Sequence, residues 1–134
     1  PWCTFTDPEI ARVGLNEKEA KEQAIAYEVT RYEISELDRA ITDGEDQGMV
    51  KVLTEPGKDR VLGVTIMSHH AGELITEYIS AMKHGIGLNK ILSTIHIYPT
   101  MAEANRFAAG IWKKNHAPKK LFELAQKFHA WRRR

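Results

Sequence analysis

The residue types best suited to chemistry gather in residues 94–106, TIHIYPTMAEANR, where polar, titratable and backbone-restricting side chains follow one another closely. His96, Tyr98 and Glu103 stand out because each can give, take or hold a proton. If a helix begins just after them, its N-terminus adds free N–H groups and a partial positive charge. We therefore take this stretch as the candidate functional site and ask which elements position it.

Residues 94–98 are predicted to form a short strand that leads into the site. Ile95 and Ile97 alternate with polar residues, which gives this strand one apolar face. Side chains two residues apart on a strand share a face, so His96 and Tyr98 should lie together on the polar side.

A sharp corner and a helix are expected after this strand. Pro99 ends the strand because it has no N–H to donate to a sheet. Thr100 and Glu103 have the T-x-x-E spacing of a capping box, which predicts a helix over residues 101–112. The spacing leaves two roles open for Glu103, a simple bond to the Thr100 N–H or a part in chemistry. His96 is equally open, since a histidine on a strand is often structural.

Composition bounds the class of protein. A length of 134 residues suits a single domain with one core, and 43% hydrophobic and 28% charged residues are ordinary for a globular chain. The net charge of +1 produces no field that would favour nucleic acid, and no apolar run is long enough to span a membrane. We expect a cytoplasmic protein with a basic C-terminal helix over residues 113–134, whose charges are solvated.

Metal and disulfide chemistry are not expected of this sequence. Cys3 is its one cysteine, which excludes an internal disulfide and any paired-cysteine zinc or redox site. We expect the Cys3 thiol to be buried and inert. His69 and His70 are adjacent, so on regular structure they point to different sides and do not chelate one ion.

Segment patterns predict an α+β fold, an antiparallel sheet with helices packed on one side. Residues 61–67 are apolar on both faces and should form a central strand, and Pro56-Gly57 predicts a tight turn just before them. Asn16 and Glu19 have the spacing of a helix cap. The expected strands are residues 2–6, 11–15, 27–34, 48–54 and 60–68. The expected helices are residues 17–24, 71–85 and 88–93, the helix at the corner and a last one after Pro118, while residues 37–46 are a turn or short helix followed by a loop.

Several stretches resemble one family when they are taken in order. Residues 1–15, PWCTFTDPEIARVGL, are similar to the opening of the C-terminal dimerisation domain of pyridine nucleotide-disulfide oxidoreductases. That family includes dihydrolipoamide dehydrogenase, glutathione reductase and mercuric reductase, and the details here resemble the mercuric-reductase-like branch. The further similar segments are residues 38–40, 48–52, 60–63, 70–75 and 94–103, so the resemblance covers residues 1–112.

The resemblance implies a role for the corner. In this family the domain forms a homodimer, and its corner reaches into the flavin site of the partner subunit, with a cis peptide before the proline. Many members have His-Pro-Thr there, followed by a Glu that orients the His, which acts as the acid and base for the redox thiol. Here Tyr98 occupies the position of that His, while Pro99, Thr100 and Glu103 are retained. The resemblance thus implies catalytic roles for Tyr98, Glu103 and the nearby His96, and flavin contact by Tyr98, Pro99 and Thr100.

We therefore interpret residues 1–134 as one dimerisation domain, a piece of a larger flavoprotein disulfide reductase that uses FAD and NAD(P)H in redox homeostasis. The sequence has no G-x-G-x-x-G after a strand and no cysteine pair, so the FAD and NAD domains of the same parent chain would supply both. Alone, the chain should bind neither cofactor and should be inactive. The alternative is a self-standing homodimeric interaction module without redox activity. In neither case is a partner nucleic acid or a membrane span expected.

Overall fold

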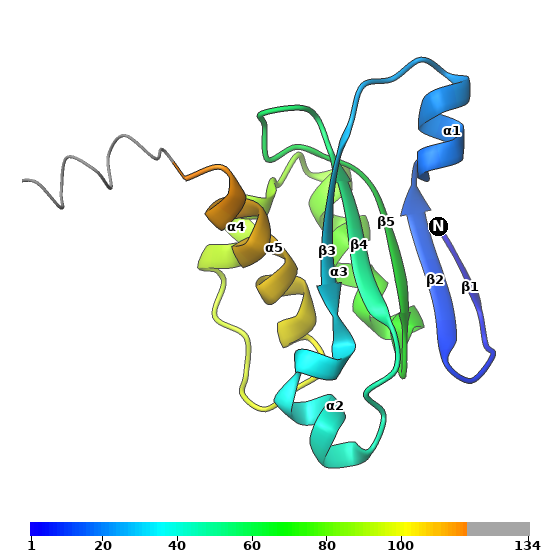
Figure 1. Ribbon diagram of the computed structural model, residues 1–134, viewed down its shortest axis with the longest axis vertical. Helices are drawn as coiled ribbons and strands as arrows, with labels where there is room; N and C mark the ends of the chain where they lie inside the picture. Colours follow the sequence, from blue (N-terminus) through cyan, green and yellow to red (C-terminus); the bar gives the residue numbers. More distant parts are fainter. Residues whose placement is uncertain (118–134) are drawn as a thin grey trace, which may run out of the picture.

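The described part of the chain, residues 1–117 of a computed structural model, is built on one antiparallel sheet with the strand order β1-β2-β5-β4-β3 (Figure 1). The strands are β1 (Trp2–Thr4), β2 (Glu9–Gly14), β3 (Glu28–Glu33), β4 (Met49–Thr54) and β5 (Val61–Ser68). All five strands expected from the sequence are present, with shifted ends, and β5 is central as its two apolar faces predicted.

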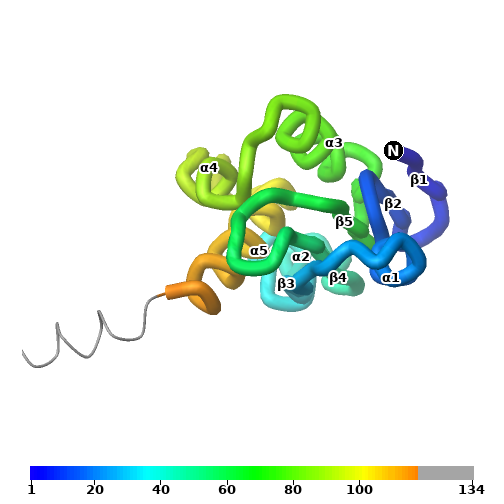
Figure 2. Tube along the Cα trace, turned by 90° about the horizontal axis from the view of Figure 1, so that it is seen from above, coloured from blue at the N-terminus to red at the C-terminus, as the bar shows by residue number. Residues whose placement is uncertain are grey.

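The two longest helices pack on the same face of the sheet. The helices are α1 (Glu17–Glu22), α2 (Asp38–Asp43), α3 (Ala71–Lys83), α4 (Leu88–Ser93) and α5 (Glu103–Asn115), with a 3-10 turn at Ile34–Glu36. Helix α3 lies against β2 and β5, and α5 lies against β3 and β4. Seen along the sheet, α3, α4 and α5 share one side, and α1 lies on the other (Figure 2). The predicted α+β architecture is confirmed.

Alternation along the central strands explains which face is covered. Val50 and Val52 of β4 are fully buried and pair in register with Ile66 and Val64 of β5, which are also fully buried. The residues next to them along each strand point to the other face, where Met49, Lys51, Thr65 and Met67 are half-buried while the paired Leu53 and Gly63 are buried. Burial of one aliphatic side chain contributes about 1.5–3 kcal/mol, so Val50, Val52, Val64 and Ile66 anchor the helix layer to the sheet.

Local signals in the sequence fix the ends of the early elements. Asn16 Oδ1 accepts the Glu19 N–H at 2.8 Å, and Glu19 Oε2 accepts the Asn16 N–H at 3.0 Å, so the predicted capping box is complete. Between β4 and β5 the Glu55 N–H donates to the carbonyl of Arg60 at 3.0 Å, which closes the predicted hairpin. A side chain of β2 satisfies an N–H group in the first turn of helix α3: Glu9 Oε2 accepts the Gly72 N–H at 2.9 Å.

Some expectations fail or lie outside the described residues. Residues 94–98 do not form a strand, and the corner helix α5 begins at Glu103 rather than at residue 101 and extends to Asn115. The stretch predicted as a turn or short helix contains the six-residue helix α2. The predicted helix after Pro118 lies outside the described residues. None of the helices within residues 1–117 is long and apolar enough to cross a membrane.

Candidate functional site

The corner is a loop that projects from the helix layer. It leaves α4 after Ser93 and enters α5 at Glu103, and Figure 1 shows it in yellow beyond α5, away from the strands. Ile95 is 93% exposed and Ile97 is 79% exposed. The expectation that the two isoleucines form the apolar face of a strand is therefore wrong, because the segment is not a strand. The helix α5 stands between this segment and the sheet, so the segment has no strand to pair with.

His96 is the side chain of this loop that turns inward. Its side chain is 7% exposed, and Nε2 lies 2.9 Å from Glu77 Oε1 and 3.1 Å from Glu77 Oε2 on α3. Nδ1 lies 3.1 Å from the carbonyl oxygen of Thr94. Tyr98 points outward and is 67% exposed, so the prediction that His96 and Tyr98 share one face is wrong.

Tyr98 is tied to helix α2. Its hydroxyl donates to Asp38 Oδ2 at 3.0 Å, and the neighbouring Pro99 carbonyl accepts a long bond of 3.5 Å from Arg39 Nη1. The hydrogen bond to Asp38 and the negative charge of that carboxylate raise the pKa of Tyr98. Tyr98 therefore remains a neutral hydroxyl at physiological pH and donates a hydrogen bond. The peptide between Tyr98 and Pro99 is cis, as expected.

Glu103 is buried at the first turn of α5, with 4% of its surface exposed. Its Oε2 accepts the N–H of Thr100 at 3.1 Å, which is half of the predicted capping box. The other half is absent, because the Glu103 N–H donates to the carbonyl oxygen of Thr100 at 3.4 Å and not to its hydroxyl, which bonds to the carbonyl of Ile97 at 2.6 Å. In the described part of the chain, no hydrogen bond joins Glu103 to Tyr98 or His96. The three candidates occupy one corner but have separate partners.

Asn105 completes a buried polar network that the sequence did not indicate. Its Nδ2 donates to the carbonyl of Leu74 at 3.0 Å and to Glu77 Oε2 at 2.9 Å, and the residue is 1% exposed. Glu77 thus accepts from both Asn105 and His96. One signal was available, because Glu77 stands between the apolar positions Ile75 and Tyr78 of α3, where a charge needs a partner.

A small cavity of about 350 Å³ lies beneath the corner, between α2, α3 and α5. Its polar lining carries both signs of charge. The polar residues that line it are Arg39, His70, Glu73, Glu77, Thr100 and Asn105. Within residues 1–117 there is no group of His, Cys, Asp and Glu side chains arranged to hold a metal ion.

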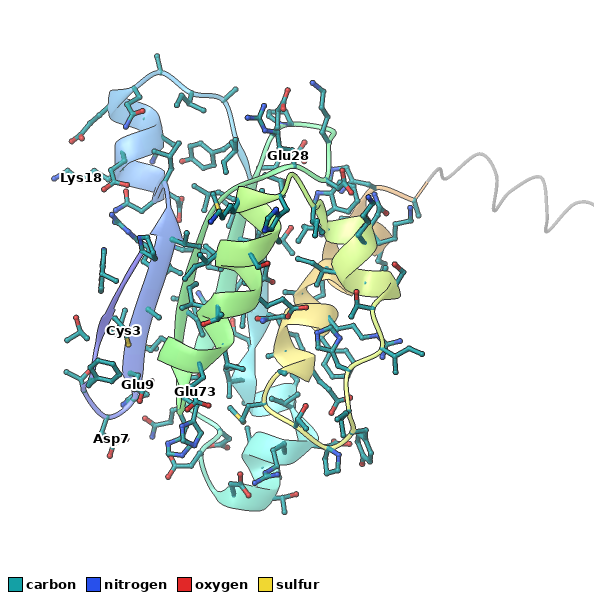
Figure 3. The ribbon with its side chains drawn as sticks, turned by 180° about the vertical axis from the view of Figure 1, so that it is seen from behind. Cys3, Asp7, Glu9, Lys18, Glu28 and Glu73 are labelled. Atoms are coloured by element: carbon teal, nitrogen blue, oxygen red, sulfur yellow. The ribbon has the colours of Figure 1, made fainter. Side chains whose placement is uncertain are left out.

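Cys3 lies far from the corner, on β1, and is half-buried rather than fully buried as expected (Figure 3). Partial burial and the nearby Glu9 carboxylate raise the pKa of the thiol. A thiol with a raised pKa is a weak nucleophile at neutral pH. The chemistry of the described residues is therefore centred on the corner.

Comparisons with known proteins identify what this chain is similar to. Residues 1–109 match the family described as "Pyridine nucleotide-disulphide oxidoreductase, dimerisation domain". The chain is 38% identical over 108 residues to mitochondrial dihydrolipoyl dehydrogenase of Bos taurus, covering 81% of this chain and 21% of that protein. It is 39% identical over 109 residues to dihydrolipoamide dehydrogenase of Chaetomium thermophilum, covering 81% of this chain and 22% of that protein. The chain therefore spans about a fifth of the length of these relatives.

Solved structures agree with the fold. LpdA from Mycobacterium tuberculosis superposes with a TM-score of 0.75 at 26% identity, covering 81% of this chain and 24% of that one. The HOCl-induced flavoprotein disulfide reductase RclA from Escherichia coli superposes with a TM-score of 0.77 at 22% identity, covering 82% of this chain and 25% of that one. In both, the matched region is about a quarter of the chain and has the same α+β architecture.

Proposed function

Because the chain belongs to the pyridine nucleotide-disulphide oxidoreductase family as its dimerisation domain, we propose that it forms a homodimer and presents its corner to the flavin site of the partner subunit. The observation that carries this proposal is the exposure of Ile95, Ile97 and Tyr98 on one projecting loop. Adjacent large apolar side chains left in water are typical of a surface that another protein covers.

We propose that the parent protein binds FAD and uses NAD(P)H to reduce a disulfide or a metal ion. The flavin, when bound, would supply the transfer of two electrons from the nicotinamide to a cysteine pair that lies outside this chain. Tyr98 would then hold a proton on its hydroxyl, because Asp38 keeps it neutral, and it would donate a hydrogen bond at the reacting site by exchanging its bond to Asp38 for one to the reacting group. Pro99 and Thr100 would contact the flavin edge. The mercuric-reductase-like branch remains a prediction, carried by the tyrosine at position 98.

Glu103 has a different part in this proposal. Its carboxylate is buried and held by the Thr100 N–H, so it would set the electrostatics behind the corner rather than touch the substrate. His96 is turned into the protein and bonded to Glu77, so we no longer propose that it transfers protons to substrate.

The alternative, a homodimeric module without redox activity, is favoured by one specific observation. Glu103, His96 and Tyr98 each have a structural partner within the domain, namely Thr100, Glu77 and Asp38. Isolation of the native protein that contains this chain, followed by mass determination and visible spectroscopy, distinguishes the two. We expect a longer protein with bound flavin, and a native protein without flavin would favour the module.

The dimer is tested separately on the 134-residue chain by sedimentation at micromolar concentration. We expect Ile97→Asp to weaken association by at least about tenfold, since central apolar residues dominate interfaces. Val29→Asp is the matched control, because Val29 is also an exposed aliphatic residue, at 44%, but lies on β3. An interface with more than about 1,000 Å² of buried surface is expected for a specific dimer. Equal effects of the two substitutions would contradict the placement of the interface.

A further inference from the structure

The corner loop is anchored to the helix layer by a polar side chain, although two large apolar side chains flank it. Ile95 and Ile97 are 93% and 79% exposed, whereas the side chain of His96 between them is 7% exposed. Apolar side chains usually supply such an anchor because their burial is favourable. The inverted arrangement leaves both isoleucines outside, free to meet another surface.

Both ring nitrogens of His96 face acceptors. Nε2 lies 2.9 Å from Glu77 Oε1, and Nδ1 lies 3.1 Å from the carbonyl oxygen of Thr94. The ring therefore bridges the Glu77 carboxylate on α3 and the backbone of the corner loop.

Glu77 is itself held in place from the opposite side. Its Oε2 accepts from Asn105 Nδ2 at 2.9 Å, and the second hydrogen of the same amide goes to the carbonyl of Leu74 at 3.0 Å. The bonds thus run from α5 through Asn105 to α3, and from Glu77 to the corner. A carboxylate suits this position because both of its oxygens accept, whereas the amide of a glutamine would place an N–H₂ donor against either His96 Nε2 or Asn105 Nδ2.

We propose that Glu77 and Asn105 are positioning residues for the corner, acting through His96 to fix the loop in the shape that presents Ile95, Ile97 and Tyr98 to the partner subunit. The purpose of that shape, presentation to a partner subunit, rests on the proposed function. The hydrogen-bond network itself does not. Neither residue touches the proposed flavin or substrate. Their effect is to lower the mobility of the loop in the free subunit, so that less conformational entropy is lost when the two subunits associate.

The test compares Glu77→Gln with Glu73→Gln in the 134-residue chain. Glu73 is the matched control because it lies on the same helix and lines the same cavity, but has no bond to His96 among the described contacts (Figure 3). The first readout is the ¹⁵N NMR spectrum of the His96 ring, assigned with His96→Gln. We expect the same Nε2 resonance in the unmodified chain and in Glu73→Gln, and a shifted Nε2 resonance in Glu77→Gln, where the bond to the carboxylate is lost.

The second readout is the backbone order of residues 95–97 from ¹⁵N relaxation. We expect rigid values of about 0.8 in the unmodified chain and Glu73→Gln, falling below about 0.6 in Glu77→Gln, while β5 stays rigid in all three. A loop that stays rigid in Glu77→Gln, or a His96 Nε2 resonance that is the same in Glu77→Gln and in the unmodified chain, would overturn the proposal. If Glu77→Gln unfolds globally, the backbone order of β5 falls as well. In that case the same measurements are made on Asn105→Asp, which keeps the size of the side chain but replaces the donor amide.

The third readout is the dissociation constant of the dimer. It should rise at least about tenfold in Glu77→Gln, which is equivalent to about 1.4 kcal/mol, and change less than about twofold in Glu73→Gln. A dimer that is unaffected when the loop has become mobile would overturn the link between the network and the partner. If the unmodified chain is monomeric, the proposed dimer fails, and the first two readouts still decide whether the network positions the loop.

Discussion

The hydroxyl of Tyr98 donates a hydrogen bond to Asp38 Oδ2 at 3.0 Å, which joins the projecting corner to the first residue of α2. The two residues are separated by 60 positions in the sequence. This bond determines how Tyr98 is used, because its one O–H is taken by the carboxylate and only the lone pairs of its oxygen remain for another group. It also aims the hydroxyl along the surface of its own subunit, so a partner that engages the Tyr98 hydroxyl must compete with Asp38.

Replacement of Asp38 tests this relationship. We expect Asp38→Ala to shift the ionisation of Tyr98 to lower pH, towards the ordinary tyrosine value near 10, because both the accepted hydrogen bond and the negative charge are lost. The ¹³C NMR shift of the Tyr98 ring carbon that carries the hydroxyl, followed from pH 8 to pH 12, measures it. Asp43→Ala is the control, since Asp43 is on the same helix but pairs with Arg39. The same titration midpoint for Tyr98 in all three proteins would show that Asp38 does not control it.

His116 gives the domain a pH-dependent contribution to stability. Its Nδ1 lies 2.8 Å from the carbonyl of Trp112 and its Nε2 lies 2.7 Å from Glu28 Oε2, near the end of β3 that carries the Glu28 label in Figure 3. The Trp112 carbonyl raises the pKa of His116 most, and the Glu28 carboxylate adds to the effect, although partial burial opposes both. The charged ring also lies at the C-terminus of α5, where a cation is favourable.

The sign of the pH effect follows from this raised pKa. The folded state favours the protonated ring, so the stabilisation is fully present below the ordinary pKa of 6.5 and is lost as pH rises through the higher folded value. We expect His116→Gln to lower the free energy of unfolding by about 0.5–1 kcal/mol at pH 6 and by less at pH 9, as judged by urea unfolding. His84→Gln is the control, because His84 also caps a helix C-terminus but has no carboxylate partner among the described contacts. A constant difference between His116→Gln and the unmodified chain across this range would refute the prediction.

The elements of the sheet could be predicted because their signals are local. The apolar run of β5 and the Pro-Gly turn between β4 and β5 act over a few residues, and the structure has the expected hairpin. The capping box of Asn16 and Glu19 is equally local and was predicted correctly. The resemblance to the family rested on these segments taken in order, and the corner lies in its expected place before α5.

The details of the corner could not be predicted for the opposite reason. The alternation around His96 matches a strand, but a strand forms only where a neighbouring strand edge is free, and the sequence does not report that. The T-x-x-E spacing of Thr100 and Glu103 gave only half of a capping box, because the Glu103 N–H bonds to the Thr100 carbonyl rather than to its hydroxyl. The pairing of His96 with Glu77 spans 19 positions and depends on how the corner loop folds back onto α3, which no local pattern encodes.

Gly63 is a position where the sheet tolerates no side chain. A Cβ added there would lie 1.9 Å from the carbonyl oxygen of Leu15, in the segment that follows β2. Because that oxygen belongs to the backbone, the clash cannot be relieved by a rotamer change, and we expect Gly63→Ala to lower the free energy of unfolding by more than about 2 kcal/mol.

Gly44→Ala provides the comparison for this prediction. Gly44 has a φ of +72° and nothing within 4 Å of an added Cβ, so only backbone strain opposes the substitution. That strain costs about 1 kcal/mol. Urea unfolding of the two variants measures the difference, and an equal loss of stability in both would mean that β5 and the segment after β2 separate at little cost.

Glu103 is the residue for which a structural and a catalytic role make different predictions. Its side chain is 4% exposed and accepts the Thr100 N–H at 3.1 Å, a bond that glutamine can also accept through its carbonyl oxygen. Glu103→Gln therefore keeps the shape and the cap and removes the charge. A cap of this kind contributes about 1 kcal/mol, so the loss of stability should be no larger than that.

In the parent enzyme of the proposed function, we expect Glu103→Gln to lower kcat at least about tenfold, because the negative charge behind Tyr98 would no longer act on the reacting site. Glu73→Gln is the control, since it also removes one carboxylate beside the corner cavity but from α3, away from the Thr100 N–H. Steady-state turnover and urea unfolding are measured for both variants. If kcat in Glu103→Gln equals that of the unmodified enzyme, Glu103 is confined to holding the Thr100 N–H, and Asp38, which accepts the Tyr98 hydroxyl, is the carboxylate left to act on the corner.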